Sequence, residues 1–80
     1  MSPLSAQADR IVDCRNLSCP LPVVRTAQAI KELGAGQHLL VMATDAGYAQ
    51  DVRAWSSRTG NEVIGIDEID GAYHVLLRRN

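Results

Sequence analysis

The sequence predicts a two-layer α/β sandwich, in which two helices pack on one face of a four-stranded mixed sheet. Segments with strand and helix periodicity follow one another in the order β-α-β-α-β-β, and 80 residues suffice for one small core. A right-handed crossover makes the first two strands parallel and places both helices on the same side of the sheet. We expect residues 1–8 to be a flexible tail, residues 9–80 to form the single domain, and the other sheet face to be open.

The first half of the chain contains a strand, a helix and a second strand. Residues 9–14 (DRIVDC) place two β-branched residues between polar ones, which predicts a short strand. Residues 20–33 (PLPVVRTAQAIKEL) carry apolar side chains at helical spacing, and Gly34 is typical of a helix end. Residues 37–44 (QHLLVMAT) are almost continuously apolar, as an interior strand is. The apolar face of the helix is expected to comprise Val23, Ala27, Ile30 and Leu33.

A second helix is predicted after this strand. Asp45 and the adjacent Thr44 are suitable N-cap residues, and we expect the helix to continue to about Thr59. Gly60 follows as a helix stop. The apolar face of this helix is expected to comprise Tyr48, Val52 and Trp55.

A hairpin is predicted to complete the sheet. Residues 61–69 (NEVIGIDEI) alternate in polarity, with Ile64 and Ile66 on the same side. The Asp-Gly pair at 70–71 is a strong signal for a two-residue turn, because both turn positions need positive φ. Residues 72–79 alternate again. Tyr73, Val75 and Leu77 are expected to face the core, and His74 and Leu76 the open face.

Composition and charge exclude several classes of function. The net charge of −1, without a cluster of Lys and Arg, argues against direct binding of nucleic acid. The sequence has no apolar run of about 20 residues that could span a membrane. The first residues lack the apolar core of a signal peptide, so we expect a cytoplasmic monomer with its thiols reduced.

The segment Cys-Pro-Leu-Pro at residues 19–22 is the candidate reactive site. With Cys19 as N-cap, Pro20 falls at the first helical position and Pro22 at the third, where neither removes a helical hydrogen bond. The positive end of the helix dipole would then favour the Cys19 thiolate and lower the thiol pKa. We expect Arg15 to support this effect. A carboxylate at the same edge, such as Asp45, would act in the opposite direction and raise the pKa.

Cys14 has three interpretations that the sequence leaves open. It is a core residue at the end of a strand, a resolving thiol that attacks an oxidised or persulfidated Cys19, or a metal ligand. A metal site is the least favoured of the three, because only His38 and His74 remain to complete the ligands. We therefore predict no metal and no organic cofactor.

Together these residues resemble the TusA/SirA-like sulfur carriers. The family pattern is Asp-x-Arg-Gly-x-x-Cys-Pro-x-Pro, then a helix and a strand ending in Thr-Asp. The chain has DCRNLSCPLP and VMATD in the matching order, and the resemblance covers residues 9–79. It departs from the pattern at Asn16 in place of Gly, Ala46 in place of Pro, and Cys14 in place of Ala. Asn tolerates the left-handed backbone region well, so we expect the corner to survive.

The resemblance implies a small sulfurtransferase-type relay protein rather than a free-standing enzyme. Cys19 would hold sulfur as a persulfide, received from a cysteine desulfurase or a rhodanese-like donor and passed to an acceptor protein. Two acceptor systems are implied, tRNA 2-thiouridine formation and cytoplasmic sulfur trafficking or oxidation. An alternative from a different class is a redox-responsive regulatory or binding module that uses the Cys14/Cys19 pair as a switch.

Overall fold

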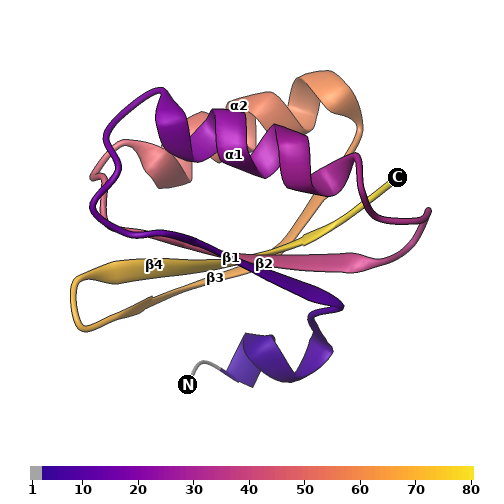
Figure 1. Cartoon of the computed structure of the whole chain (residues 1–80), viewed down its shortest axis with the longest axis horizontal. Helices are drawn as coiled ribbons and strands as arrows, with labels where there is room; N and C mark the ends of the chain where they lie inside the picture. Colours follow the sequence, from indigo (N-terminus) through magenta and orange to yellow (C-terminus); the bar gives the residue numbers. More distant parts are fainter. Residues whose placement is uncertain (1–2) are drawn as a thin grey trace.

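The structure, a computed structural model, describes residues 3–80 and consists of a helical layer on a four-stranded sheet (Figure 1). Both longer helices cover one face of the sheet, as predicted. The first two residues of the expected tail lie outside the described residues. The elements are η1 (Pro3–Gln7), β1 (Arg10–Cys14), α1 (Leu21–Ile30), β2 (His38–Ala43), α2 (Tyr48–Thr59), β3 (Glu62–Ile69) and β4 (Ala72–Arg78).

The sheet is mixed, with the strand order β1-β2-β4-β3. β1 and β2 are parallel, and β4 lies antiparallel to both β2 and β3. The carboxyl ends of β1 and β2 therefore meet at one edge, where Cys14 lies opposite Ala43. The loops into α1 and α2 both leave from this edge, so the right-handed crossover brings the two helix starts together.

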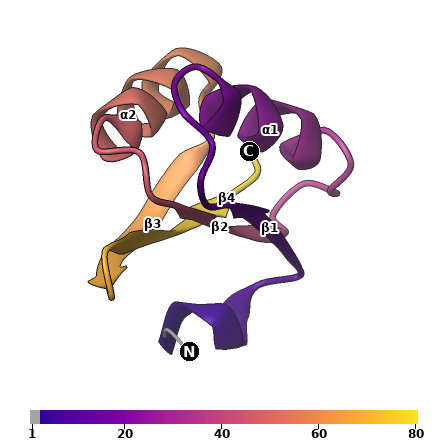
Figure 2. The same cartoon turned by 60° about the vertical axis from the view of Figure 1, so that its left-hand side comes forward.

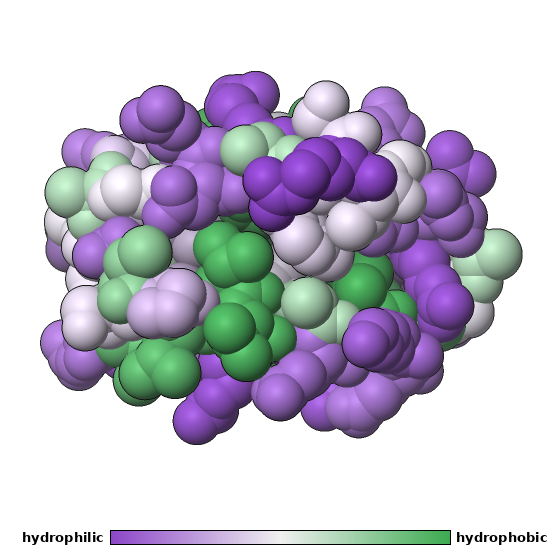
Figure 3. All heavy atoms as spheres, turned by 90° about the horizontal axis from the view of Figure 1, so that it is seen from above, coloured by the Kyte–Doolittle hydropathy of each residue, from purple (hydrophilic) through white to green (hydrophobic). Residues whose placement is uncertain are grey.

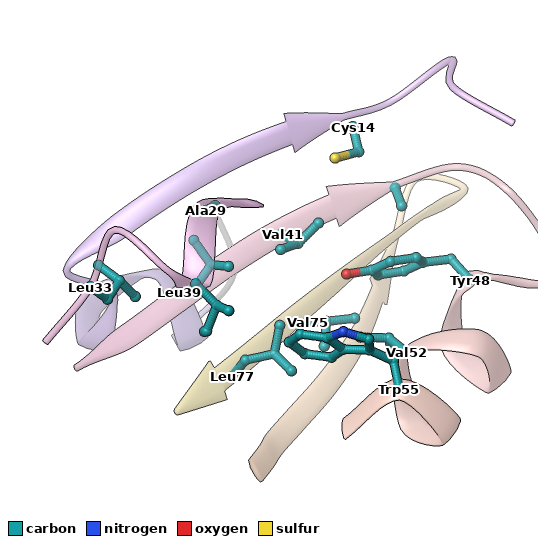
Figure 4. Packing of buried hydrophobic residues seen from close by; sticks show 12 residues of the cluster. Cys14, Ala29, Leu33, Leu39, Val41, Tyr48, Val52, Trp55, Val75 and Leu77 are labelled. Carbon is teal, nitrogen blue, oxygen red and sulfur yellow. The ribbon is translucent and has the colours of Figure 1, made fainter. Parts of the chain in front are cut away.

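The core lies between the sheet and the two helices (Figure 4). Tyr48, Val52 and Trp55 of α2 are buried there, as the helical spacing predicted. Val75 and Leu77 of β4 face them from the sheet, also as predicted. The remaining buried members are mostly aliphatic, which agrees with a chain that has three aromatic residues.

The apolar face predicted for the helix at residues 20–33 is confirmed, but it also contains a polar residue that the pattern missed. Ile30 and Leu33 are buried, and Val23 and Ala27 pack half-buried against the core. Thr26 is fully buried as well. Thr26 satisfies its hydroxyl inside the core, because Oγ1 donates to the Pro22 carbonyl at 2.7 Å and lies 2.8 Å from the Tyr48 hydroxyl. A polar residue with its hydrogen bonds satisfied can thus occupy a core position that a pattern of apolar residues misses.

The alternation predicted for residues 61–69 is broken by a bulge between Val63 and Gly65. Val63 and Ile66 both pack against the core, while the Ile64 side chain is 40% exposed. The prediction that Ile64 and Ile66 share a face was therefore wrong, because an inserted residue shifts the side chains that follow it to the opposite face. The turn after β3 is confirmed, with φ of 51° at Asp70 and 79° at Gly71.

The back face of the sheet is partly covered by η1, which lies on the side opposite the helices (Figures 1 and 2). The Leu4 side chain lies against Gly65, because a Cβ on this glycine would be within van der Waals contact of Leu4 Cδ2, at 3.4 Å. Leu40 and Leu76 on the same face are only 2% and 0% exposed. Residues 3–7 of the segment expected to be a flexible tail thus pack on the face expected to be open. The five residues of η1 are too few to show a periodic pattern, so the sequence does not predict that they pack on the sheet.

Candidate functional site

Cys19 lies in the loop between β1 and α1, at the edge where the two parallel strands end (Figure 2). The loop is tied to the end of β2, because the Asn16 N–H donates to Thr44 Oγ1 at 2.9 Å. Asn16 has a φ of 67°, which confirms that Asn occupies the left-handed region in the corner. Cys19 itself is exposed. The sequence segment therefore presents a thiol at the surface beside the helical layer.

The start of α1 lies one residue further along than predicted. Pro20 is the N-cap, with φ −98° and ψ 9°, and the first helical bond runs from the Val24 N–H to the Pro20 carbonyl at 3.1 Å. No side chain caps the helix, and the Cys19–Pro20 peptide bond is cis. Cys19 thus precedes the cap, and the prediction that it is the N-cap was wrong. Pro22 falls within the first turn, where its missing N–H costs no ladder bond.

A pocket of about 220 Å³ opens beside the thiol, between the start of α1 and the outer face of α2. The α1 side contributes two uncharged residues, and the α2 side contributes Asp51, Ala54 and Arg58 at spacings of three and four. This spacing puts all three on one helix face. The lining is Cys19, Pro20, Val23, Asp51, Ala54 and Arg58.

The surroundings of Cys19 raise its pKa rather than lower it. Partial shielding of the sulfur from water is the largest cause, followed by the charge of Asp51, the hydrogen bond between the thiol and the Asp51 side chain, and the charge of Asp45. Cys19 as a residue is nevertheless exposed. The part of the raised pKa that comes from the two carboxylates can be removed by substituting them. The predicted lowering was wrong, because lost hydration and the two carboxylates raise the pKa, and Cys19 precedes the helix cap instead of forming it.

Asp45 lies close to Cys19 but does not cap α2. Gly47 is the N-cap, and the Asp45 Oδ2 accepts the Gly47 N–H at 3.2 Å within the preceding turn. A Cβ on Gly47 would lie 3.4 Å from Asp45 Oδ2 and 3.5 Å from Asp51 Oδ2. Both carboxylates therefore lie next to this glycine.

Sequence reasoning missed Asp51. Asp51 lies in the first turn of α2, where acidic residues are common because they interact favourably with the helix dipole. Its position in the sequence therefore did not indicate its effect on Cys19. The available signal was topological: α1 and α2 both start at the edge where β1 and β2 end. First-turn side chains of one helix can therefore reach the start of the other.

Arg15 is engaged with Asp13 instead of with Cys19. Its Nε and Nη2 donate to the two carboxylate oxygens of Asp13 at 2.9 and 2.8 Å, and its backbone N–H donates to Oδ1 at 3.0 Å. This pair lowers the pKa of Asp13 to about 2. The guanidinium charge is thus largely neutralised by its neighbour in the loop.

Cys14 is buried at the end of β1, with no exposed surface, and its side chain points into the core (Figure 4). Burial raises the pKa of its thiol. Among the three interpretations, the structure places it as a core residue. Within residues 3–80 no group of three or more His, Cys, Asp or Glu side chains could hold a metal ion. His38 begins β2 next to Asp9, and His74 lies on the back face.

Apolar side chains border the site on the helical layer. Leu21 and Val24 of α1 are 46% and 43% exposed. Figure 3 looks down on this layer and shows apolar atoms gathered in its centre with polar atoms around them. Across the described part of the chain, no helix has both the length and the apolar character needed to cross a membrane.

Comparison with known proteins agrees with this geometry. The sulfurtransferase TusA family matches residues 10–79. The sulfur carrier protein TusA of Allochromatium vinosum is 36% identical over 75 residues, which cover 94% of this chain and 99% of that protein. The corresponding protein of Pseudomonas entomophila is 34% identical over 71 residues and 89% of both chains. A longer protein from Aquifex aeolicus is 37% identical over 75 residues, and this chain spans only 38% of its length.

A solved structure shows the same fold. The crystal structure of the SirA-like protein from Desulfitobacterium hafniense superimposes with a TM-score of 0.78 at 27% identity. The match covers 86% of this chain and 95% of that chain. The chain belongs to the sulfurtransferase TusA family and has the role of a sulfur carrier.

Proposed function

We propose that Cys19 is the residue that carries the sulfur, bound as a persulfide. The observation that supports this most is its exposed thiol, which lines an open pocket ahead of α1 in a chain of the TusA family. Cys14 cannot be reached by a partner without opening the core. A persulfide suits a relay, because its outer sulfur reacts with an incoming thiolate while the carrier sulfur stays bound to the protein.

The transfer steps balance without an oxidant. In loading, the Cys19 thiolate attacks the outer sulfur of a donor persulfide, a new S–S bond forms on Cys19, and the donor sulfur leaves as a thiolate. The Cys19 proton passes to solvent, and the leaving thiolate takes up a proton. In discharge an acceptor thiolate attacks the outer sulfur of Cys19, and Cys19 leaves. The transferred sulfur keeps its oxidation state throughout.

We infer a cysteine desulfurase or a rhodanese-like protein as the donor and a thiol-bearing protein as the acceptor. The use of the sulfur is tRNA 2-thiouridine formation or cytoplasmic sulfur trafficking. A partner that reaches Cys19 also meets Leu21 and Val24, which are exposed at the start of α1.

The experiment is sulfur loading followed by intact mass measurement. The protein is incubated with a cysteine desulfurase and cysteine, and separately with a rhodanese and thiosulfate. We expect the wild type and Cys14→Ala to gain the mass of one sulfur atom, and Cys19→Ser to gain none. Loading of Cys19→Ser at the wild-type level would show that another residue carries the sulfur.

The alternative function, a redox switch between the two cysteines, is not favoured by the structure. Its disulfide would need the Cys14 and Cys19 Cα atoms within about 7 Å and the two sulfurs in contact. Cys14 is buried in the core, whereas Cys19 lines an outer pocket. Under mild oxidation we expect no loss of two hydrogens from the monomer mass. Rapid and reversible loss of two hydrogens would support the switch instead.

A further inference from the structure

The pocket beside Cys19 holds one acidic and one basic side chain on the same face of α2. Asp51 and Arg58 are two helical turns apart, and Ala54 lies between them. Neither Asp51 nor Arg58 forms an ion pair with another side chain of residues 3–80. The two charges are therefore both available to a group inside the pocket.

Both charges line the pocket of Cys19, but they differ in their effect on the free thiol. Asp51 raises the pKa of the Cys19 thiol, whereas Arg58 is not among the groups that shift it. Their Cα atoms are about 10 Å apart along the helix, from a rise of 1.5 Å per residue. Helical side chains lean toward the helix N-terminus, so the long Arg58 side chain extends toward Asp51 and Cys19.

Loading changes the position and the acidity of the group in the pocket. A persulfide extends the side chain by an S–S bond of about 2 Å. It is also a stronger acid than a thiol, so its outer sulfur carries a negative charge more readily. A negative outer sulfur is repelled by the carboxylates near Sγ and attracted by a guanidinium further along.

We propose that Asp51 and Arg58 act on the two states of Cys19 in opposite ways: Asp51 keeps the unloaded thiol protonated, and Arg58 holds the loaded persulfide as an anion. This inference rests on the proposed function of Cys19. Asp51 limits reaction of the free thiol with electrophiles that are not partners. Arg58 keeps the outer sulfur in the pocket until an acceptor arrives. Both are residues that determine the specificity of sulfur transfer.

Other charges around Cys19 do not change this assignment. Asp45 acts in the same direction as Asp51 but is held by the Gly47 N–H. The α1 side of the pocket contributes only Pro20 and Val23, which are uncharged. Arg15, in the loop before Cys19, is paired with Asp13. Arg58 is therefore the only cation that lines this pocket in the described part of the chain.

The test compares two variants with two matched controls. Asp51→Asn and Arg58→Gln each remove one pocket charge. Glu68→Gln and Arg53→Gln remove a carboxylate and a guanidinium from exposed positions outside the pocket. All four residues are at the surface or half-buried, and denaturation midpoints check that each variant is folded.

The readout is the pH dependence of Cys19 alkylation by iodoacetamide, before and after loading with cysteine persulfide. For the free thiol, we expect Asp51→Asn to lower the midpoint and to speed alkylation at neutral pH about threefold to tenfold. Arg58→Gln should leave the free thiol unchanged. For the loaded protein, Arg58→Gln should raise the midpoint of the persulfide. Alkylated persulfide is recognised because a reductant removes its label with the outer sulfur.

The inference is overturned if Asp51→Asn does not speed alkylation of the free thiol, or if Arg58→Gln shifts the loaded midpoint no more than Arg53→Gln does. Its failure is distinct from failure of the proposed function. If protein donors load Cys19 but neither variant shifts a midpoint, only the charge assignment is wrong. If the variants behave as expected but protein donors load nothing, only the relay is wrong.

Discussion

Cys14 and Cys19 lie five positions apart in the sequence and in opposite environments in the fold. Cys14 ends β1, points into the core and has no exposed surface. Cys19 follows a turn that leaves the sheet, and it lines a pocket on the helical layer. The pKa is raised for both thiols, mainly by lost hydration. At Cys14 the charges of Arg25 and Asp13 act in opposite directions, whereas at Cys19 Asp51 and Asp45 both raise the pKa. Access and neighbouring charge, rather than pKa direction, therefore separate the structural thiol from the reactive one.

The largest expected difference between the two cysteines is their rate of modification. Under native conditions we expect iodoacetamide to label Cys19 on the order of 100-fold faster than Cys14, because Cys14 reacts only when the core opens locally. Peptide mass mapping after timed labelling measures both rates. Denaturant should abolish the difference. Equal native rates would mean that the end of β1 opens freely, and the comparison would fail.

The next effect is on stability. Cys14→Ser places a hydroxyl in the core and should lower the free energy of unfolding by about 1–3 kcal/mol. Cys19→Ser changes an exposed residue and should stay within about 0.5 kcal/mol. Urea denaturation of both variants beside the wild type provides the values. A larger loss for Cys19→Ser than for Cys14→Ser would reverse the assignment of core and surface.

A smaller effect concerns alkaline pH. The folded-state pKa of Cys14 is raised, so its contribution to stability is complete below the unfolded thiol pKa of about 8.5 and is lost as pH rises toward the folded value. We therefore expect the unfolding free energy to fall above that pH, and Cys14→Ala to reduce the slope. The buried Tyr48 has a raised pKa and the same sign, but acts at higher pH. Denaturation at a series of alkaline pH values measures the slope. An unchanged slope in Cys14→Ala would exclude Cys14 as its source.

The smallest effect separates two carboxylates that sequence alone places at the same edge. Asp45→Asn should lower the alkylation midpoint of Cys19 slightly, because Asp45 contributes to the raised pKa. Asp13→Asn should leave that midpoint unchanged, because Asp13 is paired with Arg15 in the loop. Alkylation rates across pH compare the two variants. Equal shifts of the midpoint in the two variants would show that any negative charge at this edge affects Cys19, and that Asp45 has no special effect.

The prediction of fold succeeded because its signals are local and repeated. Periodicity located the helices and strands, and the right-handed crossover then left one arrangement for both helices. The predicted details were wrong where a single residue decides the start of a helix or the register of a strand. The cap of α1 is Pro20 instead of Cys19, and the bulge after Val63 separates Ile64 from Ile66, which were predicted to share a face.

Sequence by itself determined the fold class, the hairpin at Asp70-Gly71 and the candidate thiol, because turn chemistry and the Cys-Pro-x-Pro segment act through neighbours along the chain. Only the tertiary structure decided which charges act on that thiol. Asp51 and Arg58 line the same pocket as Cys19 because α1 and α2 pack beside each other on the sheet. More than 30 positions of sequence separate Cys19 from either residue, so no local pattern encodes this arrangement. The burial of Cys14 and the packing of η1 were decided in the same way. Each depends on which surfaces remain uncovered after the sheet and helices have assembled.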